Sequence, residues 1–164
     1  MLALVVGLGG CGSTSESVAP KSAVVERVGD GDTLDVRSGA RVRLVQIDAP
    51  ELGEHECYAQ ESKRELERLA PPGVRIELEK DPALDDVDRY GRLLRYVEVE
   101  GMNVNVELVR RGAASPYFFR KERGEHAGQL DAAVEEAREK RAGYWSLCPA
   151  AELNTGIGSV TGPA

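Results

Sequence analysis

The chain has 164 residues, of which 41% are hydrophobic and 30% are charged. These values are typical of one soluble globular domain with a real core, and they leave no room for several domains. The net charge of −7 disfavours tight nucleic-acid binding without excluding it, because phosphate backbones favour basic surfaces, so we expect any such binding to be weak and non-processive.

The first residues resemble an export signal. Residues 2–8 form an apolar run too short to span a bilayer, and Leu-Gly-Gly-Cys at 8–11 resembles the lipobox of bacterial lipoproteins, whose cysteine is lipidated. No Lys or Arg precedes the run, so a plain disordered N-terminus is the alternative. We predict a signal segment over residues 1–11 with lipidation at Cys11, a flexible linker over 12–22, and export to the cell envelope or beyond.

The next part of the chain predicts three strands and a helix. Residues 23–28, 33–37 and 41–47 are rich in apolar side chains and are separated by turn signals, which indicates a three-stranded meander. Residues 54–70 carry apolar side chains at spacings of three and four, and Pro-Pro-Gly at 71–73 ends the predicted helix.

The second half adds two strands and two helices. The strands are predicted over residues 74–79 and 92–99, and the helices over 104–111 and 125–141. The acidic segment 81–88 lacks the ligand spacing and glycine of an EF-hand loop, so we expect it to be solvated.

Five strands in a run of three and then two, with a helix after the third, are typical of an OB-type barrel. We predict an α+β fold: a five-stranded OB-type β-barrel with about three helices, over residues 23–149. The remaining residues, 150–164, are small and polar, and we predict a disordered tail.

Three motifs stand where a strand ends or the next begins: Asp-Gly-Asp-Thr at 30–33, Arg43 leading to Asp-Ala-Pro-Glu at 48–51, and Asp-Arg-Tyr-Gly-Arg at 88–92. Calcium takes carboxylate and carbonyl oxygens, and the arginine fork fits two phosphate oxygens. A metal, a free carboxylate and two arginines are the parts needed to hydrolyse a phosphodiester. Taken singly, each residue is more typical of an ordinary turn or surface.

In order and spacing these motifs resemble the staphylococcal nuclease (thermonuclease) family over residues 23–149, and residues 104–112 resemble the family's next helix. The resemblance implies a closed barrel and calcium-dependent hydrolysis of DNA and RNA with little sequence preference, leaving 3′-phosphates. It places calcium on Asp32, Asp48 and the backbone carbonyl of Ala49. Many members have threonine at this last position, but a main-chain oxygen is available from alanine as well.

The resemblance also assigns the catalytic groups. Glu51 matches the carboxylate that takes a proton from the attacking water or positions that water. Arg43 and Arg92 match the arginines that hold the phosphoryl oxygens.

The resemblance extends to aromatic side chains. Tyr90 and Tyr117 match the tyrosines of the nucleotide pocket, where a phenol can stack on a base. Phe119 stands where a second tyrosine is common, and core packing is the alternative for Tyr117 and Phe119. We predict that Tyr144 and Trp145 lie in the core.

Two further cysteines, Cys57 and Cys148, lie on either side of most of the domain. Because disulfides persist in exported proteins, we predict that they form a bridge, and two unpaired buried thiols are the alternative.

The leading hypothesis is therefore an exported, monomeric nuclease that touches the membrane only through Cys11. A second hypothesis is a non-catalytic, surface-anchored OB-type module that binds nucleic acid or protein, and a third is a structural calcium-binding lipoprotein. Neither alternative needs Asp32, Asp48 and Glu51 together with two matched arginines.

Overall fold

The computed structural model describes residues 20–163. The predicted signal segment with Cys11, and most of the predicted linker, lie outside these residues. Within residues 20–163, no helix is both long enough and apolar enough to cross a membrane.

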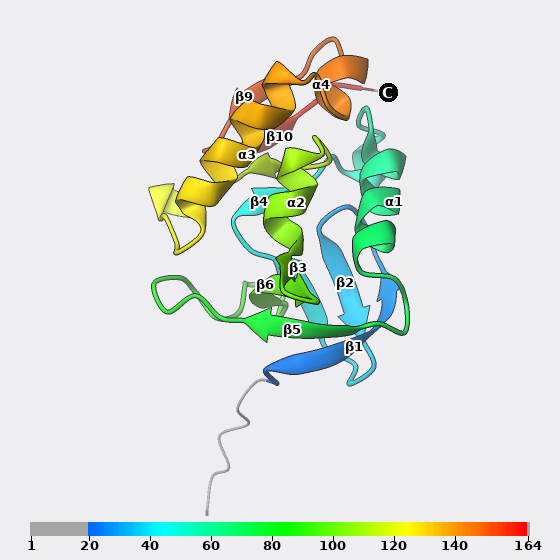
Figure 1. Ribbon diagram of the computed structural model, residues 1–164, viewed down its shortest axis with the longest axis vertical. Helices are drawn as coiled ribbons and strands as arrows, with labels where there is room; N and C mark the ends of the chain where they lie inside the picture. Colours follow the sequence, from blue (N-terminus) through cyan, green and yellow to red (C-terminus); the bar gives the residue numbers. More distant parts are fainter. Residues whose placement is uncertain (1–19, 164) are drawn as a thin grey trace, which may run out of the picture.

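Five strands close into a barrel, the lower part of the molecule in Figure 1. They are β1 (Ser22–Val28), β2 (Thr33–Val36), β3 (Arg41–Leu44), β5 (Arg75–Glu79) and β6 (Leu93–Val99). Neighbours in the order β3-β2-β1-β5-β6 are antiparallel, and a parallel pairing of β3 with β6 closes the ring. The predicted α+β fold with a five-stranded barrel is confirmed.

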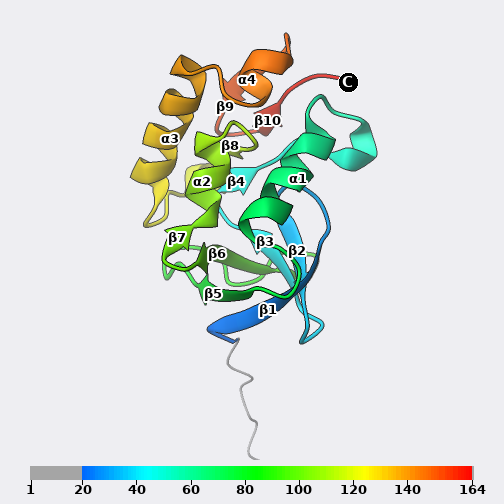
Figure 2. The ribbon, with the colours of Figure 1, turned by 45° about the vertical axis from the view of Figure 1, so that its right-hand side comes forward.

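Helices cover the upper end of the barrel, where α2 lies between α1 and α3 (Figures 1 and 2). The helical segments are η1 (Leu52–Glu54), α1 (Ala59–Leu69), α2 (Val104–Arg110), η2 (Phe119–Lys121), α3 (Ala127–Glu139) and α4 (Tyr144–Leu147). Leu66, Leu108 and Leu130 bring α1, α2 and α3 into one core with the barrel strands. The first helix begins later than predicted, because residues 52–54 form a separate 3-10 turn and Tyr58 has a left-handed φ of 73°.

The remaining strands are short: β4 (Ile47–Asp48), β7 (Met102–Asn103), β8 (Ser115–Pro116), β9 (Glu152–Asn154) and β10 (Gly158–Val160). The predicted continuous strand 41–47 is wrong, because the chain leaves the barrel at Gln46, whose φ is 61°. The Gln46 amide donates to the Glu122 carbonyl (2.7 Å) and accepts from the Gly124 N–H (2.8 Å). The break lets β4 pair with β8 instead of β2.

The prediction that residues 150–164 are disordered is also wrong. β9 and β10 form an antiparallel hairpin in which Ser159 is opposite Leu153. The hairpin packs on the domain through backbone bonds, including one from the Phe118 N–H to the Thr155 carbonyl (2.7 Å). Because backbone groups hold it, its small polar sequence gave no hydrophobic pattern that would predict strands.

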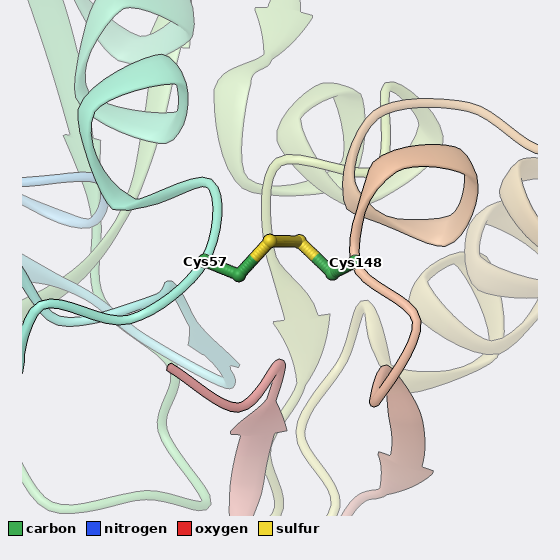
Figure 3. Close-up of a disulfide and its surroundings, with 2 residues drawn as sticks. All are labelled: Cys57 and Cys148. Carbon is green, nitrogen blue, oxygen red and sulfur yellow. A yellow bond between two sulfur atoms is a disulfide. The ribbon is translucent and has the colours of Figure 1, made fainter. Parts of the chain in front are cut away.

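The predicted Cys57–Cys148 disulfide is present (Figure 3) and joins the segment before α1 to the end of α4. The two cysteines are 91 residues apart, so the bond shortens a long loop in the unfolded chain. The alternative of two free thiols does not hold.

Replacing both cysteines, Cys57→Ser with Cys148→Ser, is expected to lower the free energy of unfolding by about 4 kcal/mol in the chain-entropy model. Urea unfolding of this variant and of the wild type, both without reductant, measures the difference. Equal unfolding midpoints with equal slopes would contradict the prediction.

Candidate active site

A tight turn between β1 and β2 carries the first motif. A Cβ atom added at Gly31 would lie 2.1 Å from the Ser62 Oγ of α1 and 2.6 Å from the Ala49 Cβ. Only glycine therefore lets this turn approach α1 so closely. The turn directs the side chain of Asp32 inward, where it is 3% exposed.

The carboxylates of Asp32 and Asp48 both contact the guanidinium of Arg43. The Arg43 Nη2 lies 2.9 Å from Asp32 Oδ2 and 2.7 Å from Asp48 Oδ1. The other terminal nitrogen, Nη1, donates to the carbonyls of Leu44 (2.8 Å) and Ile47 (2.7 Å). These backbone contacts fix the guanidinium, so two carboxylates that are 16 residues apart in sequence converge on one point.

When both carboxyls of the cluster are ionised, two negative charges face the single positive charge of Arg43. Burial raises the pKa of the Asp32 carboxyl to about 8 against the attraction of Arg43, and the neighbouring Asp30 and Asp48 add to the rise. Burial alone would lower the pKa of Arg43, but Asp32 and Asp48 outweigh it and hold that pKa above its ordinary value. A hard cation at this point would relieve the unbalanced charge.

The cluster offers oxygen donors to a cation. Within residues 20–163, no group of three or more His, Cys, Asp or Glu side chains is arranged to hold a metal. The residues that could hold a hard cation here are Asp32 and Asp48, through their carboxylates, and the adjoining Ala49, through its carbonyl. Calcium takes six to eight oxygen ligands and accepts water or phosphate oxygens for the remainder, whereas zinc prefers closed nitrogen and sulfur sites.

Glu51 follows this cluster at the start of η1. Its N–H donates to Glu56 Oε2 (2.7 Å), which anchors the backbone. Burial raises the pKa of the Glu51 carboxyl, and the charges of Asp30 and Asp48 raise it further. The carboxylate is therefore a better proton acceptor than an ordinary surface glutamate.

The third motif is organised by Asp88, a residue of the motif to which the sequence assigned no role. Its carboxylate accepts from the backbone N–H groups of Tyr90 (2.9 Å) and Arg92 (3.0 Å) and from Arg92 Nε (2.6 Å). Arg92 Nη1 also reaches the Thr33 hydroxyl (3.5 Å), which donates to Asp32 Oδ1 (3.1 Å). All three motifs are thus joined. The spacing of Asp88 four residues before Arg92 is the signal that could have revealed its role.

A cavity of about 490 Å³ opens beside the cluster, lined by both arginines and by Tyr90, Tyr117 and Phe119. Tyr90 is 68% exposed and Phe119 51% exposed, so neither is a core residue. The core-packing alternative for Phe119 is wrong, and Tyr117 lies beside it with ring centroids 6.3 Å apart. Tyr144 is fully buried, as predicted.

The acidic segment 81–88 is more than a solvated loop. Asp81 is 2% exposed and accepts from the Tyr96 hydroxyl (3.2 Å) and the Glu125 N–H (2.8 Å). Asp86 pairs with the buried Arg95 (2.7 Å). The expectation of a solvated loop is therefore wrong for Asp81, whereas the Asp86 side chain is 42% exposed.

The chain is similar in sequence to a known family and to several known proteins. The family described as staphylococcal nuclease homologue matches residues 41–147. Micrococcal nuclease from Shigella flexneri is 35% identical over 134 residues, which cover 74% of this chain and 72% of that protein. Thermonuclease from Staphylococcus intermedius is 30% identical over 140 residues, 80% of each. Endonuclease YhcR from Bacillus subtilis is 34% identical over 152 residues, which cover 80% of this chain but only 12% of that protein.

Proposed function

Because the chain belongs to the staphylococcal nuclease family, we propose that it is a nuclease that hydrolyses phosphodiester bonds of DNA and RNA with calcium bound. The observation that carries the proposal is the convergence of Asp32 and Asp48 on Arg43, with Arg92 reaching the same cluster through Thr33. The names of the relatives, which include endonuclease and micrococcal nuclease, support the reaction class.

Asp32, Asp48 and the Ala49 carbonyl would hold the calcium ion. When bound, the ion would supply positive charge that stabilises the phosphoryl oxygens as the water attacks. Glu51 takes the proton of the attacking water or orients that water. Its partial burial and the neighbouring acids suit this role, because both raise the pKa of its carboxyl.

The two arginines stabilise the charge that develops on phosphorus oxygens. Arg92 is aligned by Asp88 through its Nε and backbone N–H, and it lines the cavity together with Arg43. A guanidinium held in this way loses little conformational entropy when it binds phosphate.

The aromatic side chains that line the cavity, of which Tyr90 and Phe119 are exposed and Tyr117 is partly buried, suit unpaired bases. Tyr90, Tyr117 and Phe119 offer ring faces on which any base can stack, so they confer affinity without sequence preference. Since the chain's net charge is −7, we expect weak binding whose strength falls as salt rises.

Cleavage of single-stranded DNA and of RNA by the purified chain tests the proposal, with calcium chloride compared against a chelator. We expect cleavage of both substrates in calcium and none in chelator. A folded protein that binds calcium and DNA but cuts neither substrate would favour the non-catalytic binding module, with Ala49 as the first position to examine.

We also propose export, with a lipid anchor on Cys11 and a monomeric domain. The Cys57–Cys148 disulfide supports an oxidising compartment. Mass spectrometry of protein taken from producing cells would detect the acyl groups on Cys11, and an unprocessed N-terminus would contradict the proposal.

A further inference from the structure

The C-terminal hairpin, residues 152–160, lies beyond the last residue that the family comparison matches, which is residue 147. It nevertheless contacts the proposed metal site. β10 lies beside β4 (Figure 2), and the Ser159 N–H donates to Asp48 Oδ2 at 2.9 Å across 111 residues of sequence.

Gly158 brings the hairpin against the same carboxylate. A Cβ atom at this position would lie 2.3 Å from Asp48 Oδ2 and 2.7 Å from its Cγ, and the φ of Gly158 is +111°. Both the space and the backbone conformation therefore require glycine. Asp48 Oδ1 contacts the Arg43 guanidinium, and Asp48 Oδ2 accepts from the Ser159 N–H. The two contacts together fix the orientation of the Asp48 carboxylate.

The hairpin is held in place by backbone bonds at its turn and just after β10. At the turn, the Phe118 N–H donates to the Thr155 carbonyl (2.7 Å), just after β8, the pairing partner of β4. After β10, the Cys57 N–H donates to the Gly162 carbonyl (2.8 Å), next to the disulfide. These backbone bonds hold the hairpin against the site. Hydrophobic packing contributes less, because only Leu153 of its strands packs on the hydrophobic core.

We propose that the C-terminal hairpin is a positioning element of the metal site, which orients the Asp48 carboxylate through the Ser159 N–H and the close approach of Gly158. The inference rests on the proposed function. β4 is only two residues long and the Asp48 side chain is 21% exposed, so β4 alone constrains the carboxylate weakly. Hydrogen bonds behind a metal ligand lower the entropy lost on binding and typically change metal affinity by about 10–100-fold.

The test compares Gly158→Ala with Gly156→Ala in the full chain. The new Cβ at residue 156 would meet only Asn154 Oδ1, at 3.6 Å, so this variant is a control within the same hairpin. Calorimetric titration with calcium chloride is expected to show about tenfold weaker binding in Gly158→Ala and unchanged binding in Gly156→Ala. The calcium concentration for half-maximal cleavage should rise by the same factor.

Thermal unfolding in chelator measures the effect of each variant on stability alone. If the hairpin were merely structural, the variants would have a lower melting temperature, but the calcium affinity of the folded protein would be unchanged. A chain ending at Ala151 provides a second variant, since the buried core cluster lies entirely before residue 152. It too is expected to bind calcium about tenfold more weakly.

Unchanged calcium affinity in either folded variant would overturn the inference. Faster cleavage by the chain that lacks the hairpin would also overturn it, because the hairpin would then inhibit the site instead of positioning Asp48. Wild-type protein that neither binds calcium nor cleaves would refute the proposed function itself. The wild-type arm therefore distinguishes failure of the function from failure of the hairpin's role.

Discussion

Glu51→Gln is expected to lower the turnover number for single-stranded DNA by about 10³-fold while calcium affinity changes little. Glutamine keeps the shape of the side chain but cannot accept a proton from water. The substitution leaves the contacts of Asp32 and Asp48 with Arg43 intact, so the metal site should persist. Cleavage kinetics and calcium titration of the same preparation measure the two effects separately.

Glu54→Gln is the matched control, because Glu54 lies three residues away in η1 and is exposed. It should cleave at the wild-type rate. Retention of more than about a tenth of the activity by Glu51→Gln would place the proton transfer elsewhere, since a positioned general base contributes about 10²–10⁴-fold.

The pH dependence of the cleavage rate tests the role of Glu51 independently. Burial and neighbouring acids raise its pKa above the ordinary value, and only the deprotonated form accepts a proton. The wild-type rate should therefore be low in acid and rise with pH through that raised pKa. In saturating calcium, which keeps Asp32 deprotonated, the residual activity of Glu51→Gln should lack this rise.

Local sequence patterns were sufficient for the order of the barrel strands and the main helices, because alternation and three- or four-residue spacing report directly on buried faces, whereas the closure of the barrel was expected from the family resemblance. The family motifs also brought Asp32, Asp48 and Arg43 to one place, as the structure shows. Their positions beside strand ends explain this success, since β2 and β3 are neighbours in the barrel.

The features that sequence did not reveal depend on distant partners. The break at Gln46 is stabilised by the loop at residues 122–124, which is more than 70 positions away. The hairpin depends on backbone bonds to Phe118 and Cys57, and no side-chain pattern encodes such contacts. Asp88 belongs to the third motif, but its role was not predicted, because an aspartate shortly before a Tyr-Gly turn is typical of any loop.

Asp32→Asn is expected to abolish calcium-dependent cleavage and yet to raise the free energy of unfolding of the chelated protein at pH 8. The pKa of Asp32 is raised from 3.8 to about 8 by burial, which outweighs the attraction of Arg43. Between these values the folded state binds more protons than the unfolded state, so wild-type stability falls as pH rises. An amide has no charge to bury, and its oxygen can still accept from the Ala49 N–H, which donates to Asp32 at 2.9 Å.

Urea unfolding in chelator from pH 5 to pH 8 measures the effect, and the gain of Asp32→Asn over wild type should grow steadily across this range. Asp85→Asn removes the same charge from an exposed position and serves as the control, with no such gain. In excess calcium the order should reverse, because only the wild type gains binding energy in the folded state. If Asp32→Asn is less stable than wild type in chelator at every pH, the ion pair with Arg43 outweighs the cost of burial. The cluster would then be a structural ion pair, stable without a metal, and the charge argument for calcium would fail.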